Sequence, residues 1–256
     1  MTKFKKYYTL FIISLLFLTS CVSKKQVLYM QDLNSTDVSQ VSISQHMLQE
    51  NDILKIDVTS LEKKASIPYN KFSLQGNTTN SLDLMQLNGY LVSNNKTINL
   101  PVIGEISVVD KTPKDLENYI KEILVNEGHL TKPIVTVRLL NAKITILGEV
   151  RNPGTYKFTE KNISFLQAIG LAGDLTIDGN RKDIIVIREF DGKRTTTKLD
   201  FTSSSFLTSP YQNIFPNDVI IVNPVSKKIK SAGLVGNIST VLSIASILLS
   251  TIILIR

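Results

Sequence analysis

The stretch KITILGEVRNPGTYKF (residues 143–158) contains two runs of alternating apolar and polar residues, separated by Asn152-Pro153-Gly154. Alternation with a period of two predicts strands that bury one face. Proline fixes φ at the second position of a β-turn, and glycine accepts the positive φ of the third position. We therefore predict a type II turn at Pro153 and Gly154, joining two strands at the start of a domain.

The residues that follow this hairpin continue a β-rich domain. Ser164 is a good N-cap for a short helix, which Gly173 would end. DIIVIREF and RTTTKLD alternate on either side of Asp191-Gly192, a dipeptide that favours a tight hairpin turn. PNDVIIV (216–222) supplies a last strand. We expect this domain to span residues 142–225.

A second set of strands and one helix precede it. ENDILKIDV (50–58) alternates as a half-buried strand, and PIVTVRLL (133–140) is apolar enough for another. Between them, Thr112 is a good N-cap, Pro113 suits the first helical position, and Gly128 marks a helix end. We expect a domain over residues 46–141. The predicted fold class is α+β, with two small β-rich domains followed by a C-terminal transmembrane helix.

Asn-Asp occurs at 51–52 and at 217–218, each time just before an alternating strand. The pattern indicates either a repeated building plan or the common use of Asn and Asp in turns, and the sequence leaves both open. The only histidines, His46 and His129, have no evident partner in the sequence, so we expect them at the surface. DLTIDGNRKD (174–183) lacks the ligand spacing of a calcium loop.

The composition argues against several functions. The chain has net charge +7, and the charge is +4 without the first 20 residues, which carry three lysines and no acid. With no tryptophan and no basic cluster, nucleic acid is not an expected partner. Motifs typical of hydrolases, metalloproteases or nucleotide-binding enzymes are missing. We therefore expect no enzyme activity, no cofactor and no metal.

The N-terminus has the features of an exported lipoprotein. Three lysines precede an apolar run at residues 10–18, and Thr19 and Ser20 stand before Cys21, the single cysteine of the chain. This pattern predicts a signal peptide over residues 1–20. The ending LTSC resembles the bacterial lipobox, in which the cysteine takes a diacylglycerol. We expect Cys21 to be the lipid anchor and residues 21–45 to be a tether.

Residues 231–255 contain no charged side chain. A helix over residues 234–254 would measure about 31 Å, which matches the hydrocarbon core of a bilayer. We therefore predict a transmembrane helix within residues 231–256. Four serines lie on one side of this helix, and they indicate either close helix–helix packing or the lining of a pore. These are Ser239, Ser243, Ser246 and Ser250.

Taken in order, these segments resemble the outer-membrane polysaccharide export proteins of the Wza-like group, over about residues 46–225. The first domain resembles the polysaccharide-export domain and the second resembles the soluble-ligand-binding β-grasp (SLBB) domain. The stretches that carry the resemblance are ENDILKIDV, GYLVSNNKTINLPVIGEISV, the helix at 112–127, KPIVTVRLL, ITILGEVRNPGTYKF, FLQAIGLAGDLTIDGNRKDIIVIR and FPNDVIIVNP.

The resemblance implies a ring of subunits, commonly eight, whose C-terminal helices form a porin-like channel for capsular polysaccharide or exopolysaccharide. It also implies a periplasmic body, lipid anchoring in the outer membrane, and an inner-membrane polysaccharide copolymerase as partner. The chain has one β-grasp domain where the best-known members have two, so we expect a shorter body. The alternative is a membrane-anchored periplasmic glycan-binding or structural lipoprotein that is not itself the conduit.

We predict that Cys21→Ala abolishes lipid attachment and leaves the precursor uncleaved or poorly retained in the membrane, because no other thiol can accept the lipid. Metabolic labelling with a fatty acid measures this directly. Equal label on the wild-type and alanine proteins would show that Cys21 is not the anchor.

Overall fold

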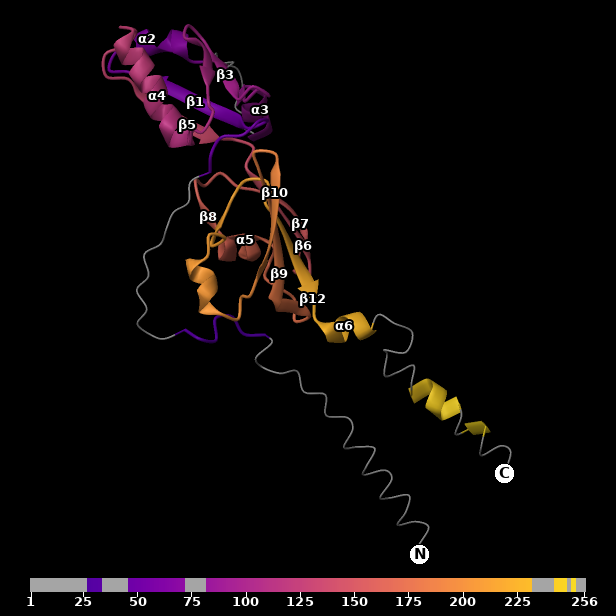
Figure 1. Cartoon of the computed structure of the whole chain (residues 1–256). Coiled ribbons are helices and arrows are strands. Elements are labelled where there is room, and N and C mark those ends of the chain that lie inside the picture. Colours follow the sequence, from indigo (N-terminus) through magenta and orange to yellow (C-terminus); the bar gives the residue numbers. More distant parts are fainter. Residues whose placement is uncertain (1–26, 34–45, 72–81, 232–241, 248–249, 252–256) are drawn as a thin grey trace, which may run out of the picture.

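The computed structural model describes residues 27–33, 46–71, 82–231, 242–247 and 250–251. Two domains lie end to end (Figure 1), the first over residues 46–140 and the second over residues 142–225. Each domain has its own hydrophobic core, and Leu139, at the connection, packs against both. Both domains are β-rich and contain helices, so the α+β prediction is confirmed for these two domains.

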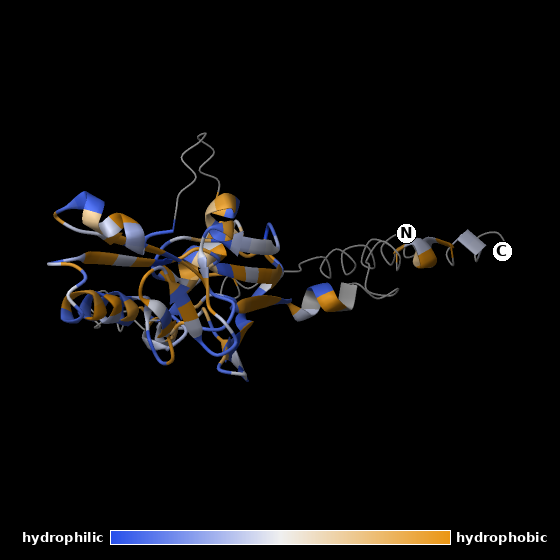
Figure 2. Cartoon of the chain, turned by 90° about the horizontal axis from the view of Figure 1, so that it is seen from above, coloured by the Kyte–Doolittle hydropathy of each residue, from blue (hydrophilic) through white to orange (hydrophobic). Residues whose placement is uncertain are grey.

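The first domain is built on a three-stranded antiparallel sheet with the order β2-β1-β5. These strands are β1 (Ile53–Thr59), β2 (Tyr90–Leu91) and β5 (Ile134–Leu139). A separate hairpin consists of β3 (Thr97–Leu100) and β4 (Gly104–Ser107). Along β1 every second side chain is buried, as the alternation in the sequence predicts. Figure 2 shows hydrophobic and hydrophilic residues alternating along the strands.

Helix α4 (Pro113–Asn126) covers this sheet and buries Leu116, Ile120 and Leu124. The predicted cap is confirmed, because Thr112 accepts the Asp115 amide while the Asp115 side chain accepts the Thr112 amide. The described part of residues 61–87 contains three short helices. These are α2 (Lys63–Ser66), η2 (Ile67–Tyr69) and α3 (Leu82–Leu87). Helices this short have no periodic pattern that a sequence could reveal.

The second domain contains a five-stranded mixed sheet with the order β10-β9-β12-β6-β7. Its central pair, β12 and β6, is parallel, and the other pairs are antiparallel. The strands are β6 (Lys143–Gly148), β7 (Gly154–Lys157), β9 (Gly179–Phe190), β10 (Lys193–Leu199) and β12 (Val219–Pro224). The Asp191-Gly192 hairpin is confirmed, since both residues have positive φ and Phe190 pairs with Lys193.

Helix α5 (Phe165–Leu171) packs into the core of the second domain. Its predicted cap is confirmed by the reciprocal bonds between Ser164 and Gln167. Phe165, Phe201 and Phe206 form an aromatic cluster with ring centroids 4.6–5.6 Å apart. The second domain also contains β8 (Ile163–Ser164), η3 (Ser204–Thr208) and β11 (Asn213–Ile214), and β8 pairs with β11.

The type II turn predicted at Pro153 and Gly154 is wrong. Gly154 is the first residue of β7 and pairs with Ile146, so it is part of the ladder and its φ is not positive. The chain leaves β6 instead at Gly148, which has φ +87°. The reason is non-local: a Cβ on Gly148 would lie 2.1 Å from the carbonyl oxygen of Val222 in the neighbouring strand. The glycine is required where β6 approaches β12.

Part of the segment expected to be a tether is packed against the second domain. The amides of Met30 and Gln31 donate to the carbonyls of Phe201 and Thr202, each at 2.8 Å. The Tyr29 hydroxyl donates to Asp174, and the Tyr29 ring contacts the core. These residues, which we call the N-terminal segment (residues 27–33), are therefore part of the folded body, in contrast to the predicted tether.

We predict that Gly148→Ala lowers the free energy of unfolding by about 2 kcal/mol or more, because it combines positive φ with a backbone clash. Gly154→Ala is the matched control: a Cβ there meets no heavy atom closer than 4.0 Å, so a change within about 0.5 kcal/mol is expected. Hydrogen exchange of the β6 and β12 amides measures the effect locally. Equal protection in the two variants would contradict this assignment of the turn.

Candidate functional site

A cleft of about 450 Å³ lies between the two domains. This volume is within the range of small-ligand sites, about 300–1,000 Å³. The cleft is assembled from segments that are far apart in the sequence, and none of its residues was predicted as a site residue. The first domain contributes His46, Pro113, Lys114 and Arg138, and the second contributes Phe158, Lys161, Asn162 and Phe215.

His46 lies in the cleft wall and is not a surface residue, so that expectation is wrong. Its side chain is 9% exposed, and its ring meets the edge of the Phe215 ring with centroids 5.7 Å apart. Nε2 is 3.6 Å from the Asp52 carboxylate, beyond hydrogen-bonding distance, and neither ring nitrogen has a hydrogen-bond partner. Burial of an unsatisfied imidazole costs free energy, which makes this residue unusual in a folded core.

Phe215 is held in place by charged residues of the second domain. The Arg188 guanidinium stacks on its ring at 3.9 Å from the centroid. Two nitrogens of Arg188 donate to the buried Asp218 carboxylate at 2.9 and 2.7 Å. The bidentate pair fixes the guanidinium plane, and the plane in turn positions the aromatic ring against His46.

The two Asn-Asp pairs have the same local structure. Asn51 and Asn217 have φ values of 67° and 66°, in the left-handed region that asparagine tolerates. Asp52 and Asp218 are each buried, and each accepts the amide of the residue three positions before, at 2.9 and 2.8 Å. The same turn therefore introduces β1 and β12, as both interpretations of the Asn-Asp pattern predict.

Glu117 on α4 is a buried carboxylate in the wall behind the cleft. It accepts the amide of Val137 at 3.1 Å, on the free edge of β5, and the Lys114 ammonium at 3.0 Å. Burial is the largest single influence and opposes ionisation, but these two donors outweigh it and hold the pKa of Glu117 below its usual range. The charged carboxylate thus ties α4 to the strand that borders the cleft.

Polar contacts across the domain junction are few and exposed. Lys96 pairs with Asp191 at 2.6 Å, and Lys157 pairs with Asp83 at 2.8 Å. Exposed ion pairs contribute little to stability, about 0–1 kcal/mol each, so packing of His46 and Leu139 against the second domain carries much of the junction.

The predicted residues of the C-terminal helix are described in part. Residues 242–247 and 250–251 are helical, and Ser239 lies outside the described residues, as does Cys21. Ser246 donates to the Ser243 carbonyl at 2.8 Å, and Ser250 donates to the Ser246 carbonyl at 2.7 Å. Within the part of the chain that the structure describes, no helix is both long and apolar enough to cross a bilayer.

Among the described residues, no group of three or more His, Cys, Asp or Glu side chains could hold a metal ion.

Two family models match the chain. Residues 40–140 match the model described as polysaccharide biosynthesis/export protein, and residues 143–198 match the SLBB domain. The first match covers the first domain, and the second runs from β6 into β10. The two matches together agree with the domain combination of a Wza-like polysaccharide export protein. A comparison with curated proteins gave no match.

We predict that Glu117→Gln lowers stability by about 1–3 kcal/mol at pH 7, since the charged hydrogen bonds to Val137 and Lys114 are lost. Because the pKa of Glu117 is depressed in the folded protein, its contribution is present above about pH 4.3 and is lost as pH falls through the folded pKa. The gap between wild type and variant should therefore close under acid conditions.

Thermal denaturation at pH 7, 5 and 3.5 tests this prediction. Glu122→Gln, on the exposed side of the same helix, is the control and should track the wild type at all three values. A gap between wild type and Glu117→Gln that is constant with pH would contradict the assigned role of the carboxylate.

Proposed function

We propose that this chain is an outer-membrane lipoprotein whose copies form a ring and whose C-terminal helices build the channel through which a capsular or extracellular polysaccharide leaves the cell. The proposal is based on the order of the segments along the chain. The two matched domains are followed by residues 231–255, a stretch without a charged side chain. The resemblance to Wza-like proteins supplies the expectation of a ring, commonly of eight subunits.

The positions of the two proposed membrane attachments indicate which domain faces the membrane. The N-terminal segment and α6 both lie at the end of the second domain that is far from the first domain (Figure 1). Cys21 is six residues before Val27, so a lipid on Cys21 would lie within about 22 Å of the packed segment. We infer that the second domain faces the membrane and that the first domain extends into the periplasm, towards an inner-membrane copolymerase.

Helix α6 (Ser226–Ser231) connects the second domain to the proposed membrane helix. Lys228 pairs with Glu149 at 2.7 Å and lies 3.8 Å from Asp178. The hydrogen bond from Lys228 is the main reason that the pKa of Glu149 lies below its usual range. The pair ties the start of the C-terminal segment to β6, which would hold the helices of a ring at a defined position above the periplasmic body.

The described helical residues 242–247 and 250–251 are all exposed, and they include both apolar and hydroxyl side chains. Leu242, Ile244 and Ile247 are 60%, 54% and 62% exposed, and a lipid or a neighbouring helix would cover such apolar surface. Ser246 and Ser250 donate their hydroxyl hydrogens to the helix backbone, which lowers the cost of taking them out of water. We propose that the serine side faces the interior of the ring.

The proposed role is passive and needs no enzyme activity. A hydrated sugar chain cannot cross hydrocarbon, because its hydroxyl groups would lose water without gaining other partners. A ring of helices with hydroxyl groups inside and apolar side chains outside removes this barrier. The free energy for movement would come from polymer synthesis and the inner-membrane partner.

A second candidate is a membrane-anchored periplasmic lipoprotein that binds glycan or links two membranes but is not the conduit. The interdomain cleft favours this candidate, since a conduit does not need one. Membrane fractionation separates the two functions. Recovery in the inner membrane would contradict the outer-membrane conduit.

We predict that Ser246→Asp leaves ring assembly intact and alters export, because water in a lumen would solvate the carboxylate. In a closely packed or lipid-facing position the same charge costs about 2.5–3.5 kcal/mol. Leu248→Asp is the matched control: it is two residues away, on the opposite side of the helical wheel, and should abolish assembly. Size-exclusion chromatography in detergent measures assembly, and labelling of surface polysaccharide measures export.

Two outcomes would contradict the proposal. Loss of assembly in Ser246→Asp, equal to that in Leu248→Asp, would show that the serines are packing residues. Removal of residues 231–256 is the stronger test of the helix itself. If polysaccharide still reached the surface in cells that make only the truncated chain, the C-terminal segment would not be the channel.

A further inference from the structure

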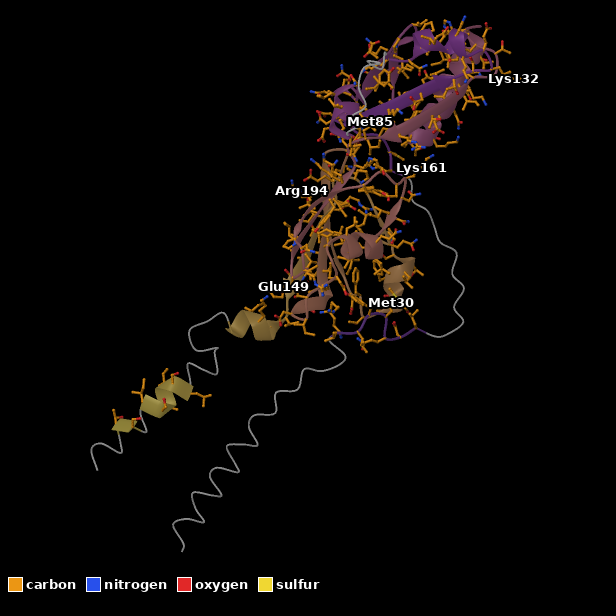
Figure 3. All side chains as sticks on the ribbon, turned by 180° about the vertical axis from the view of Figure 1, so that it is seen from behind. Met30, Met85, Lys132, Glu149, Lys161 and Arg194 are labelled. Atoms are coloured by element: carbon orange, nitrogen blue, oxygen red, sulfur yellow. The ribbon has the colours of Figure 1, made fainter. Side chains whose placement is uncertain are left out.

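Two cations from different domains lie at the interdomain cleft without a partner. Arg138 on β5 and Lys161 before β8 both line it, and both side chains belong to exposed residues. Neither side chain makes a hydrogen bond or an ion pair with any described residue, although the charge of Lys161 helps to lower the pKa of Glu117. Figure 3 shows Lys161 at the junction of the two domains. Unpaired cations on both walls of one cleft favour an anionic ligand.

The register of the first sheet places Arg138 at a position where its charge lowers the stability of the sheet. Arg138 stands directly opposite Lys55 in the antiparallel pair of β1 and β5. Like charges at such positions destabilise a sheet. The Lys55 ammonium forms an ion pair with the Asp57 carboxylate at 3.1 Å. Arg138 has no ion-pair partner among the described residues of the domain, so its charge is not compensated. An uncompensated arginine beside a cleft is better explained by a ligand than by the fold.

The other charged side chains at the cleft are already engaged. Lys114 bonds to Glu117 at 3.0 Å, and Glu160 accepts the amide of Thr159 at 3.0 Å. Counting these groups, three cations face two carboxylates, which leaves a surplus of one positive charge, and Arg138 and Lys161 are the two cations without an ion-pair partner among the described residues. The anion-binding capacity of the cleft is therefore set by these two residues.

The remaining walls are apolar, with polar groups at the edge. Pro113, Phe158 and Phe215 supply apolar surface, and Asn162 supplies an amide. His46 also lines the cleft, against Phe215, and neither of its ring nitrogens has a hydrogen-bond partner. A sugar ring presents apolar C–H faces and hydroxyl edges, which fit apolar walls with few polar groups. A carboxylate on that ring would match the planar guanidinium of Arg138.

We propose that the interdomain cleft binds a carboxylated sugar unit, such as a uronic acid residue, of the polysaccharide that the protein exports. The proposal rests on the proposed function for the source of the ligand. Arg138 and Lys161 hold the carboxylate, while the prolines and phenylalanines contact the ring. Because the two cations come from different domains, an occupied cleft also fixes the angle between the domains.

The test uses the purified full chain in detergent and a tetrasaccharide of glucuronic acid, with a tetrasaccharide of glucose as the neutral probe. Isothermal titration should show binding of the acidic probe, about tenfold tighter than the neutral one and weaker at high salt. The double variant Arg138→Gln/Lys161→Gln should bind the acidic probe at least about tenfold more weakly. Lys121→Gln/Lys182→Gln, one exposed lysine from each domain away from the cleft, should bind as the wild type does.

Equal binding of the acidic probe by both double variants would overturn the proposal, as would the absence of binding to the wild type. Inorganic phosphate that binds as tightly as the acidic probe would also overturn it, because the cleft would then be a general anion site. Export in cells that lack the chain tests the proposed function separately. Export that depends on the chain, together with a cleft that binds no acidic sugar, would overturn only the inference about the cleft.

Discussion

The buried ion pair between Arg188 and Asp218 connects the elements on which the domain arrangement depends. It joins β9 to the start of β12, and the arginine stacks on Phe215, which meets His46 of the other domain. Removing one member of such a pair leaves a buried charge without compensation, which costs about 3–5 kcal/mol. Loss of either residue would therefore disturb the sheet of the second domain and the cleft together. The corresponding aspartate of the first domain, Asp52, lies beside His46 in a turn of the same design.

Packing of apolar side chains contributes more to the junction between the domains than the ion pairs do. Leu139 contributes to both cores, whereas the ion pairs at the periphery are exposed. A ligand held by Arg138 and Lys161, which come from different domains, would add a further contact across this junction. At the other end of the second domain, the N-terminal segment and the Lys228–Glu149 pair fasten both chain ends to the body. The proposed membrane attachments are thus next to the same end of the second domain, far from the domain that would meet a periplasmic partner.

Local chemistry explains which features the sequence predicts correctly. The cap of α4 at Thr112 and the hairpin at Asp191-Gly192 depend on neighbouring residues only, and both are confirmed. The turn at Gly154 is wrong because the glycine that needs positive φ, Gly148, is set by the approach of β6 to Val222, 74 positions further along the chain.

The cleft could not be predicted for the same reason. It joins residues near 46, 113, 138, 160 and 215, and no single stretch carries a signal for it. The packing of Tyr29 on Asp174 is equally non-local, and the segment around it has no periodicity. Cys21 and Ser239 lie outside the described residues, so the lipid anchor and the full serine stripe stay predictions.

The central claim is that copies of this chain close into a ring around a channel made by their C-terminal helices. Electron microscopy of the full chain, purified from membranes in detergent, tests the claim most directly. The account predicts closed rings with a central opening and a narrower helical bundle on the side of the second domain. Single subunits, or assemblies without a central opening, would contradict it.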